Sequence, residues 1–299
     1  MKRWFMSRNI YIAFLLTLMY VPIALVIIYS FNESRFNSVW RGFSFVWYWE
    51  LFRDRAIFTA LRNSLVLATT SSLAAAVIGT LGAVGMAWDN PKAKSKGKHL
   101  NAPVSSILSR VMEYLSILPI MTPEIILGMV LLAFFSLLGL PPGMLTLILA
   151  HTCFSIPYVY LLVKARLAGL EKSYVEAARN LGAGPWRAFY DVMLPLLLPA
   201  IVSGILLSFA MSFDDVIISI FVTGPNTNTL PIRIYTQIKT GVTPKTNALC
   251  SLLFIITVLL CILSAAVSQL KLPAQGRGMG ERGIQKTRKT VEKLIEQRL

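Results

Sequence analysis

Six runs of apolar residues, each long enough to cross a lipid bilayer, constrain the fold of this 299-residue chain more than any other feature. A spanning helix needs about 20 mostly apolar residues, because its backbone polar groups must be satisfied within the segment. Charged residues are only 14% of the chain, against about a quarter in soluble domains. The sequence therefore predicts an all-α membrane protein with six transmembrane helices, at about residues 10–30, 64–88, 114–138, 145–163, 196–221 and 248–270.

The basic residues are concentrated in a few segments. The formal net charge is +15, and Lys and Arg gather at the N-terminal end, at 92–98, around 164–187 and from residue 271 onward. These segments alternate with less basic ones across the apolar runs, which is the positive-inside asymmetry of membrane proteins. The pattern predicts that both termini face the cytoplasm (N-in/C-in) and that the basic segments meet anionic lipid. It argues against a nucleic-acid partner.

The apolar runs divide the chain into three parts. Residues 1–63 are expected to hold the N-terminal cytoplasmic end, the first transmembrane helix and an outer loop with a short interfacial helix at 50–62. The first run is too long for a signal peptide and no small-residue cleavage site follows, so we expect an uncleaved anchor. Residues 64–270 form the transmembrane core, with a cytoplasmic loop at about 165–195, and residues 271–299 form a basic cytoplasmic tail.

Small residues recur along the second apolar run. Gly79, Gly82 and Gly85 are three residues apart, and positions 74–76 are all alanine. Small residues at such spacings let helix backbones approach closely in lipid. We therefore expect a helix-packing seam here.

One polar segment interrupts the apolar pattern between the fourth and fifth runs. It reads Glu176-Ala177-Ala178, three residues, Gly182, nine residues, and then Val192-Met193-Leu194-Pro195. Helix-forming residues lead up to Gly182, which favours a sharp helix end, and Pro185 suits the first turn of a second helix that Leu194-Pro195 would close. The segment predicts a helix, a turn and a helix on the cytoplasmic side. The alternative is an ordinary amphipathic loop.

The full spacing of this segment resembles the EAA loop of ATP-binding-cassette (ABC) importer permeases, with Val192 where the pattern usually has Ile. The resemblance implies a type I ABC importer permease (MetI-like) fold. It also implies that Glu176, Ala177, Ala178 and Gly182 couple this chain to a separate ATPase subunit.

The chain has no phosphate-binding loop of its own, since Gly97-Lys98 is followed by His99. We expect no catalytic residues, no cofactor and no metal site here. ATP and Mg²⁺ would be bound by the partner ATPase. The chain would be a transporter subunit and not an enzyme.

Three acids lie inside the predicted spans: Glu124, Asp214 and Asp215. A carboxylate in the bilayer costs several kcal/mol and normally faces a water-filled path or a partner. Pro119 and Pro123 predict a kink or break before Glu124. Carboxylates at two depths suit a cationic substrate. The alternatives are pairing with Lys or Arg of a partner subunit, or capping of a helix near the outer interface.

Further motifs resemble the spermidine/putrescine importer permeases of the PotC type. They are Ser30–Phe36, Trp47-Tyr48, Pro123-Glu124, Ser212–Val216, Phe221–Pro225, Gly241–Pro244 and Asn247–Leu249. The resemblance implies that Trp47, Glu124, Asp214 and Asp215 contact or guide a polyamine. Similar permeases often carry Asp where Glu124 stands.

The family also implies a set of partners. They are an ATPase dimer, a second permease subunit in a heterodimer, a periplasmic polyamine-binding protein and the lipid of a bacterial inner membrane. In such a complex, ATP binding closes the ATPases and the permeases open outward to take the substrate.

Other readings of the sequence remain open. The same machinery could carry a metal cation, an opine or another organic cation. A proton-coupled secondary transporter would use Glu124 and Asp214 as a relay, but it leaves the Glu176–Gly182 segment unexplained. A membrane-embedded enzyme lacks a nucleophile–base pair or a metal cluster at sensible spacing.

Overall fold

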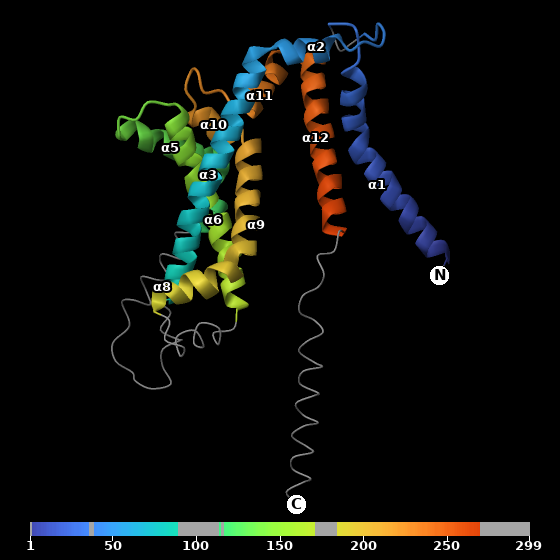
Figure 1. Cartoon of the computed structure of the whole chain (residues 1–299). Coiled ribbons are helices and arrows are strands. Elements are labelled where there is room, and N and C mark those ends of the chain that lie inside the picture. Colours follow the sequence, from blue (N-terminus) through green and yellow to red (C-terminus); the bar gives the residue numbers. More distant parts are fainter. Residues whose placement is uncertain (1, 36–38, 89–113, 115–116, 171–183, 270–299) are drawn as a thin grey trace, which may run out of the picture. The chain divides into compact units, whose positions relative to one another are not determined.

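A computed structural model describes residues 2–35, 39–88, 114, 117–170 and 184–269 (Figure 1). The described residues are helical apart from turns, loops and one isolated β-bridge between Asn32 and Phe43. The chain forms two compact units, residues 31–246 and residues 1–30 with 247–299. The elements are α1 (Lys2–Tyr29), α2 (Val46–Arg53), α3 (Arg55–Trp88), α5 (Glu124–Leu137), α6 (Met144–Ala168), α8 (Pro185–Arg187), the π-helical turn η2 (Ala188–Met193), α9 (Leu194–Asp214), α10 (Ile217–Val222), α11 (Leu230–Thr240) and α12 (Pro244–Gln269).

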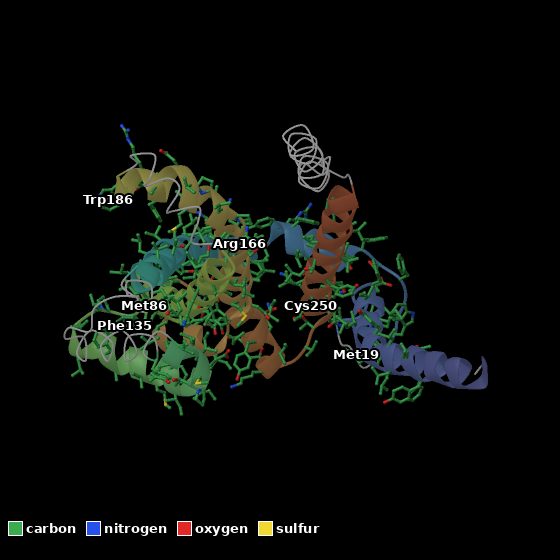
Figure 2. All side chains as sticks on the ribbon, turned by 90° about the horizontal axis from the view of Figure 1, so that it is seen from below. Met19, Met86, Phe135, Arg166, Trp186 and Cys250 are labelled. Carbon is green, nitrogen blue, oxygen red and sulfur yellow. The ribbon has the colours of Figure 1, made fainter. Side chains whose placement is uncertain are left out.

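Four stretches are long and apolar enough to cross a membrane: Ile10–Tyr29, Arg55–Met86, Met144–Ala168 and Ala188–Asp214. Two shorter apolar helices, Glu124–Leu137 and Pro244–Leu259, correspond to the third and sixth predicted spans. In α1 the apolar side chains from Ile10 onward are largely exposed, as Met19 illustrates (Figure 2). A helix that is apolar all round without being buried fits a lipid environment. The chain is thus a multi-pass helical membrane protein, while the count of six spans and the N-in/C-in orientation stay predictions.

Three long helices, α3, α6 and α9, form the centre of the larger unit and run side by side (Figure 1). A Cβ atom on Gly79 of α3 would lie 3.0 Å from the carbonyl oxygen of Ile156 in α6, so only glycine allows this approach. Gly82 is in ordinary contact range of Tyr160, and Gly85 faces open space. The predicted packing seam is therefore confirmed at Gly79, and the contact with α6 becomes looser at Gly82 and is absent at Gly85.

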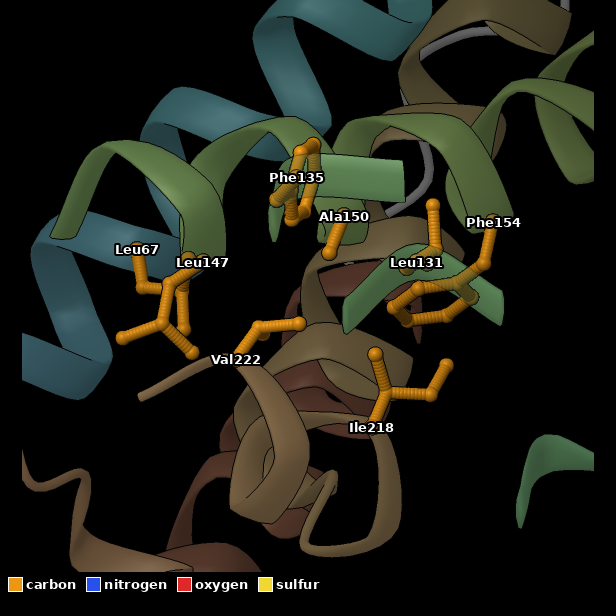
Figure 3. Close-up of a cluster of buried hydrophobic side chains, with 8 residues drawn as sticks. All are labelled: Leu67, Leu131, Phe135, Leu147, Ala150, Phe154, Ile218 and Val222. Carbon is orange, nitrogen blue, oxygen red and sulfur yellow. The ribbon is translucent and has the colours of Figure 1, made fainter. Parts of the chain in front are cut away.

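A cluster of buried apolar side chains packs α5 and α10 onto α3 and α6 (Figure 3). Its buried members are Leu67, Leu131, Phe135, Leu147, Ala150, Phe154, Ile218 and Val222. The end of α10 is tied to the start of α6, because the carbonyl oxygen of Val222 accepts from Thr146 Oγ1 at 2.9 Å and from the Gly143 N–H at 3.3 Å. A Cβ atom on Gly224 would collide with the carbonyl oxygen of Pro142. The loop after α10 therefore packs closely against the loop before α6.

Two predicted boundaries are wrong. The fifth span is not one helix over 196–221, since α9 ends at Asp214 and α10 begins at Ile217. Apolar residues lie on both sides of the junction and no proline or glycine marks it, so the two aspartates are its only local sign. The interfacial helix predicted at 50–62 is also wrong. The helix α2 ends at Arg53, and the following residues belong to α3, which begins at Arg55 because the Asp54 carboxylate caps it.

Of two other local predictions, the break before Glu124 is confirmed and the second helix after Gly182 is confirmed only at its start. The break before Glu124 is confirmed, since Pro123 adopts φ −53° and ψ 132° and α5 starts at the next residue. A helix does begin at Pro185, as expected. It does not close at Leu194-Pro195, because η2 carries the helical backbone directly into α9. Figure 1 shows that this stretch runs across the end of α9.

Candidate functional site

The predicted coupling residues, Glu176, Ala177, Ala178 and Gly182, lie outside the described residues. The segments on either side of them are described. Arg166, near the end of α6, donates its Nε–H to the carbonyl oxygen of Leu196 in α9 at 3.1 Å. This bond ties together the two helices that flank the loop (Figure 2). The coupling role itself stays a prediction.

An exposed aromatic pair stands where the chain returns from that loop. Trp186 and Tyr190 stack with ring centroids 6.4 Å apart, and both side chains are more than half exposed (Figure 2). Large aromatic groups at such positions serve as anchors at the membrane interface or as contacts with a partner.

The break between α9 and α10 is built around Asp215. Its backbone is extended, with φ −67° and ψ 131°. Its Oδ1 accepts from the Ile218 N–H at 3.2 Å, and its Oδ2 accepts from the N–H and the Oγ–H of Ser219, both at 2.8 Å. The carboxylate thus satisfies the free amide groups at the start of α10, as a capping side chain does. One alternative reading of the acids, helix capping, therefore describes Asp215.

A buried histidine completes this junction. The His151 side chain, from the middle of α6, is fully buried. Its Nδ1 lies 2.7 Å from Ser212 Oγ, and its Nε2 lies 2.9 Å from Ser219 Oγ and 3.5 Å from Asp215 Oδ2. Ser212 Oγ lies 3.1 Å from Ser71 Oγ of α3. Groups from α3, α6, α9 and α10 therefore meet in one polar network inside an apolar bundle.

The adjacent acids have different surroundings. The Asp215 side chain is 6% exposed, whereas Asp214, the last residue of α9, is exposed. Asp214 continues the exposed face of α9 that carries Ser203, Leu207 and Ala210 at helical spacing. The opposite face, with Leu197, Gly204, Ser208 and Ser212, is buried against the bundle. The structure therefore separates the pair that the sequence treats as one unit.

The other predicted path residues lie on different elements. Glu124 is exposed in the first turn of α5, where a carboxylate is favourable because of the helix dipole. The helix α5 packs against α10, so Glu124 belongs to an element that adjoins the Asp215 junction. Trp47 in α2 is buried and donates its Nε1–H to the carbonyl oxygen of Asn32 at 2.7 Å. Its indole N–H is therefore used to hold the loop that precedes α2.

Asp54 forms a second acid-capped junction, between α2 and α3. Its Oδ1 accepts from the Ala56 N–H at 2.9 Å, and its Oδ2 lies 2.9 Å from Lys245 Nζ and 3.5 Å from an Arg233 guanidinium nitrogen. Partial burial alone would raise the pKa of this carboxyl. The hydrogen bonds from Lys245 and Ala56, together with the charges of Lys245 and Arg233, hold the pKa below its ordinary value of 3.8. Sequence reasoning did not single out Asp54, because it weighed only acids inside spans. It gave His151 no role, because the two histidines of the chain, His99 and His151, are too far apart in sequence to suggest a metal site.

The chain is similar to known transport proteins in sequence. Residues 99–273 match the family described as "Binding-protein-dependent transport system inner membrane component". The spermidine/putrescine transport system permease protein PotC of Haemophilus influenzae is 36% identical over 90% of this chain and 98% of its own length. PotC of Escherichia coli K12 is 37% identical over 84% of this chain and 89% of its own length. The putrescine transport system permease protein PotI of the same strain is 38% identical over 79% of this chain and 82% of its own length.

Two solved structures share the fold at low sequence identity. A chain of a bacterial ABC transporter that imports the acidic polysaccharide alginate aligns with TM-score 0.66 and 14% identity, covering 91% of this chain and 97% of that one. A chain of the methionine ABC transporter MetNI in an inward-facing conformation aligns with TM-score 0.57 and 20% identity, covering 74% of this chain and 95% of that one.

Proposed function

Since the chain belongs to the family of binding-protein-dependent transport system inner membrane components, we propose that it is the permease subunit of an ATP-driven importer of polyamines. One observation carries the proposal. Relatives named for spermidine and putrescine transport match this chain at 36–38% identity over most of both lengths. The subunit forms part of the path through the membrane and has no catalytic step of its own.

The chemistry of the exposed acids supports a cationic cargo. Glu124 and Asp214 are exposed carboxylates on otherwise apolar helices. An acid at such a place is costly unless it faces water, a partner or a charged substrate. A polyamine carries several ammonium groups along an apolar chain, so separate carboxylates along a path match its charge spacing. In this proposal Glu124 and Asp214 contact the cargo, and Asp215 and Trp47 shape the path.

Coupling to ATP requires other chains. The Glu176–Gly182 segment is proposed as the contact with an ATPase dimer, which binds ATP and Mg²⁺. The bond between Arg166 and Leu196 supports a mechanical role for the loop, because a push on the loop reaches α6 and α9 together. A second permease subunit, in a heterodimer, and a periplasmic polyamine-binding protein complete the proposed importer. Both termini face the cytoplasm, and the chain resides in the bacterial inner membrane.

Uptake assays test this function directly. Labelled spermidine and putrescine are supplied to cells with and without the gene, with ATP depletion and collapse of the proton gradient as separate arms. We expect deletion to abolish uptake of at least one polyamine, ATP depletion to do the same, and a plasmid copy to restore it. The strain must lack other polyamine importers. Uptake that depends on the proton gradient and persists without ATP would refute ATP coupling.

A second cargo class is tested in the same cells. If neither polyamine depends on the gene, labelled opines, other organic cations and metal cations replace them in the assay. Gene-dependent uptake of one of these would keep the importer and change the cargo. The coupling contact is tested by Gly182→Trp, which we expect to abolish uptake while the chain remains in the membrane.

A further inference from the structure

The two adjacent carboxylates at the end of α9, those of Asp214 and Asp215, have different surroundings and should have different roles. Resting on the polyamine function and the Asp214 contact proposed above, we propose that His151 is a positioning residue for Asp214. It acts through Asp215, which supports the junction from inside and does not contact the substrate. The sequence patterns assign no role to this histidine.

The Asp215 carboxylate already accepts hydrogen bonds from groups of this chain. Both of its oxygens accept hydrogen bonds from the first residues of α10, and its side chain is almost wholly covered. A carboxylate that accepts three hydrogen bonds from N–H and O–H groups has little capacity left for an ammonium group. To reach a substrate, Asp215 would have to release the start of α10. It therefore serves as a support.

The hydrogen bonds around His151 run in one direction. Ser219 has a single hydroxyl proton, which it donates to Asp215 Oδ2, so His151 Nε2 must be the donor to Ser219 Oγ. In the neutral ring, Nδ1 is then an acceptor and takes the proton of Ser212 Oγ. The chain of bonds leads from Ser212 through His151 and Ser219 to the carboxylate. Successive bonds of this kind polarise and strengthen one another.

This arrangement decides where α9 stops. No proline or glycine lies between Ser212 and Ile220, so the local sequence permits a continuous helix. The helix stops because the Asp215 side chain takes over the N–H groups of Ile218 and Ser219. His151 holds both Ser212, before the break, and Ser219, after it. Losing the histidine would free the two sides to rejoin as one helix.

The position of Asp214 is unfavourable for a residue that only stabilises the helix. A carboxylate at the C-terminal end of a helix adds negative charge to the negative end of the dipole. Asp214 is exposed at this end, on the face of α9 that the bundle leaves open. The carboxylate and the terminal carbonyl groups together form a negative site. Such a site attracts a cation, and it exists only while the helix ends there.

The first test is a double-mutant cycle in the complete transporter. Uptake is measured at saturating spermidine and putrescine, where the binding protein is fully loaded, and is divided by the amount of this chain in the membrane. We expect Asp214→Asn and His151→Phe each to lower the rate about three- to tenfold. His151→Phe added to Asp214→Asn should lower it by less than about twofold further, because both changes disable one site. If the double variant instead loses uptake by the product of the two single losses, the proposal is overturned.

Matched variants separate positioning from general damage. Ser155, one turn further along α6, is equally buried, and its hydroxyl has no hydrogen-bond partner in the described part of the chain. We expect Ser155→Ala to transport normally. Asp214→Glu keeps the charge and should retain more uptake than Asp214→Asn. Ser212→Ala removes the contacts of one hydroxyl, with His151 and Ser71, and leaves the bonds of Asp215 in place, so it should give a partial loss in a chain that still folds. Equal losses for Ser155→Ala and Ser212→Ala would refute the network's role.

A second measurement does not depend on the cargo. Asp214→Cys is introduced with Cys153, Cys250 and Cys261 replaced by Ala, and its reaction with a cationic methanethiosulfonate reagent is timed in membranes. We expect His151→Phe to slow labelling at least about fivefold, because α9 no longer ends at this position, whereas Ser155→Ala leaves it unchanged. If the wild type imports no polyamine but this difference appears, the proposed cargo is wrong and the positioning role stands. Equal labelling rates would overturn the positioning role, whatever the cargo.

Discussion

Two apolar stretches of this chain are interrupted, and they are interrupted by different means. Before α5 the break falls at Pro123, which lacks an N–H and disfavours helix at the preceding residue. After α9 it falls at Asp215, whose carboxylate caps α10 through Ile218 and Ser219 and is covered by His151 from α6. The first break is a property of the chain itself. The second combines a local cap with a buried partner on a distant helix.

The junction between α2 and α3 belongs to the second kind. One Asp54 oxygen caps the next helix and the other meets cations from α11 and α12, much as Asp215 caps α10 and meets His151. Acid-held junctions should therefore fail when a distant partner is removed, whereas the proline junction should fail only through its own residue.

The largest effect should come from displacing α10. Gly224→Ala would place a methyl group against the Pro142 carbonyl oxygen, which is backbone and cannot turn aside. We expect the free energy of unfolding to fall by about 2–3 kcal/mol in detergent titrations of the purified chain. Gly85→Ala is the control, because nothing lies within 4 Å of its Cβ and alanine favours a helix by up to about 1 kcal/mol. Equal behaviour of the two variants would show that α10 is not held by this contact.

The neighbouring acids should then differ in stability. Asp215→Ala leaves the Ile218 and Ser219 amide groups without their acceptor, and we expect a loss of about 2 kcal/mol. Asp214→Ala removes an exposed side chain and should change the free energy of unfolding by no more than about 0.5 kcal/mol. Both are measured in the same detergent titration. Similar losses would contradict the division of roles.

The Asp54 junction should weaken in acid. A carboxyl whose pKa is lowered by folding adds stability that is complete above its ordinary pKa, near 3.8, and is lost as the pH falls through the lower folded value. We expect Asp54→Asn to cost about 1 kcal/mol at pH 7, and the gap to the wild type to begin to narrow only below about pH 4. Thermal midpoints across pH 3–7 check this. A gap that stays constant would exclude the ion pairs as its source.

Among the residues that make the three junctions, Asp215, Asp54 and Pro123, the smallest change in stability is expected at Pro123. Pro123→Ala removes no N–H donor, and the hydrogen bond from the Leu127 N–H to the carbonyl oxygen of residue 123 can persist. We expect the free energy of unfolding to change by less than about 1 kcal/mol. The chain on the two sides of residue 123 should become straighter. Spin labels at Leu118 and Val130, both exposed, should move toward the roughly 18 Å of a continuous helix. Unchanged distances would mean that packing, and not proline, makes this break.

The sequence predicted the features that one residue sets by itself, and it did not predict those that involve a distant partner. The break before Glu124, the helix start at Pro185 and the close approach at Gly79 were predictable, because each follows from the shape of one residue. The division of Asp214 from Asp215, the role of His151 and the Asp54 junction were not. Each involves a partner far away in the sequence: His151 and Ser212 are 61 residues apart, and Asp54 and Lys245 are 191 residues apart.

The sequence by itself determined that this chain crosses the membrane as apolar helices, and its motifs identified the transporter family. Hydrophobic length and local motifs are enough for that, because each spanning helix satisfies its own backbone. Only the tertiary structure decided which of two adjacent carboxylates is covered and which is exposed. The physical reason is that a buried acid must be paired with donors. Ile218 and Ser219 supply donors from the adjacent chain, but the histidine that covers this site is brought there by the packing of α6.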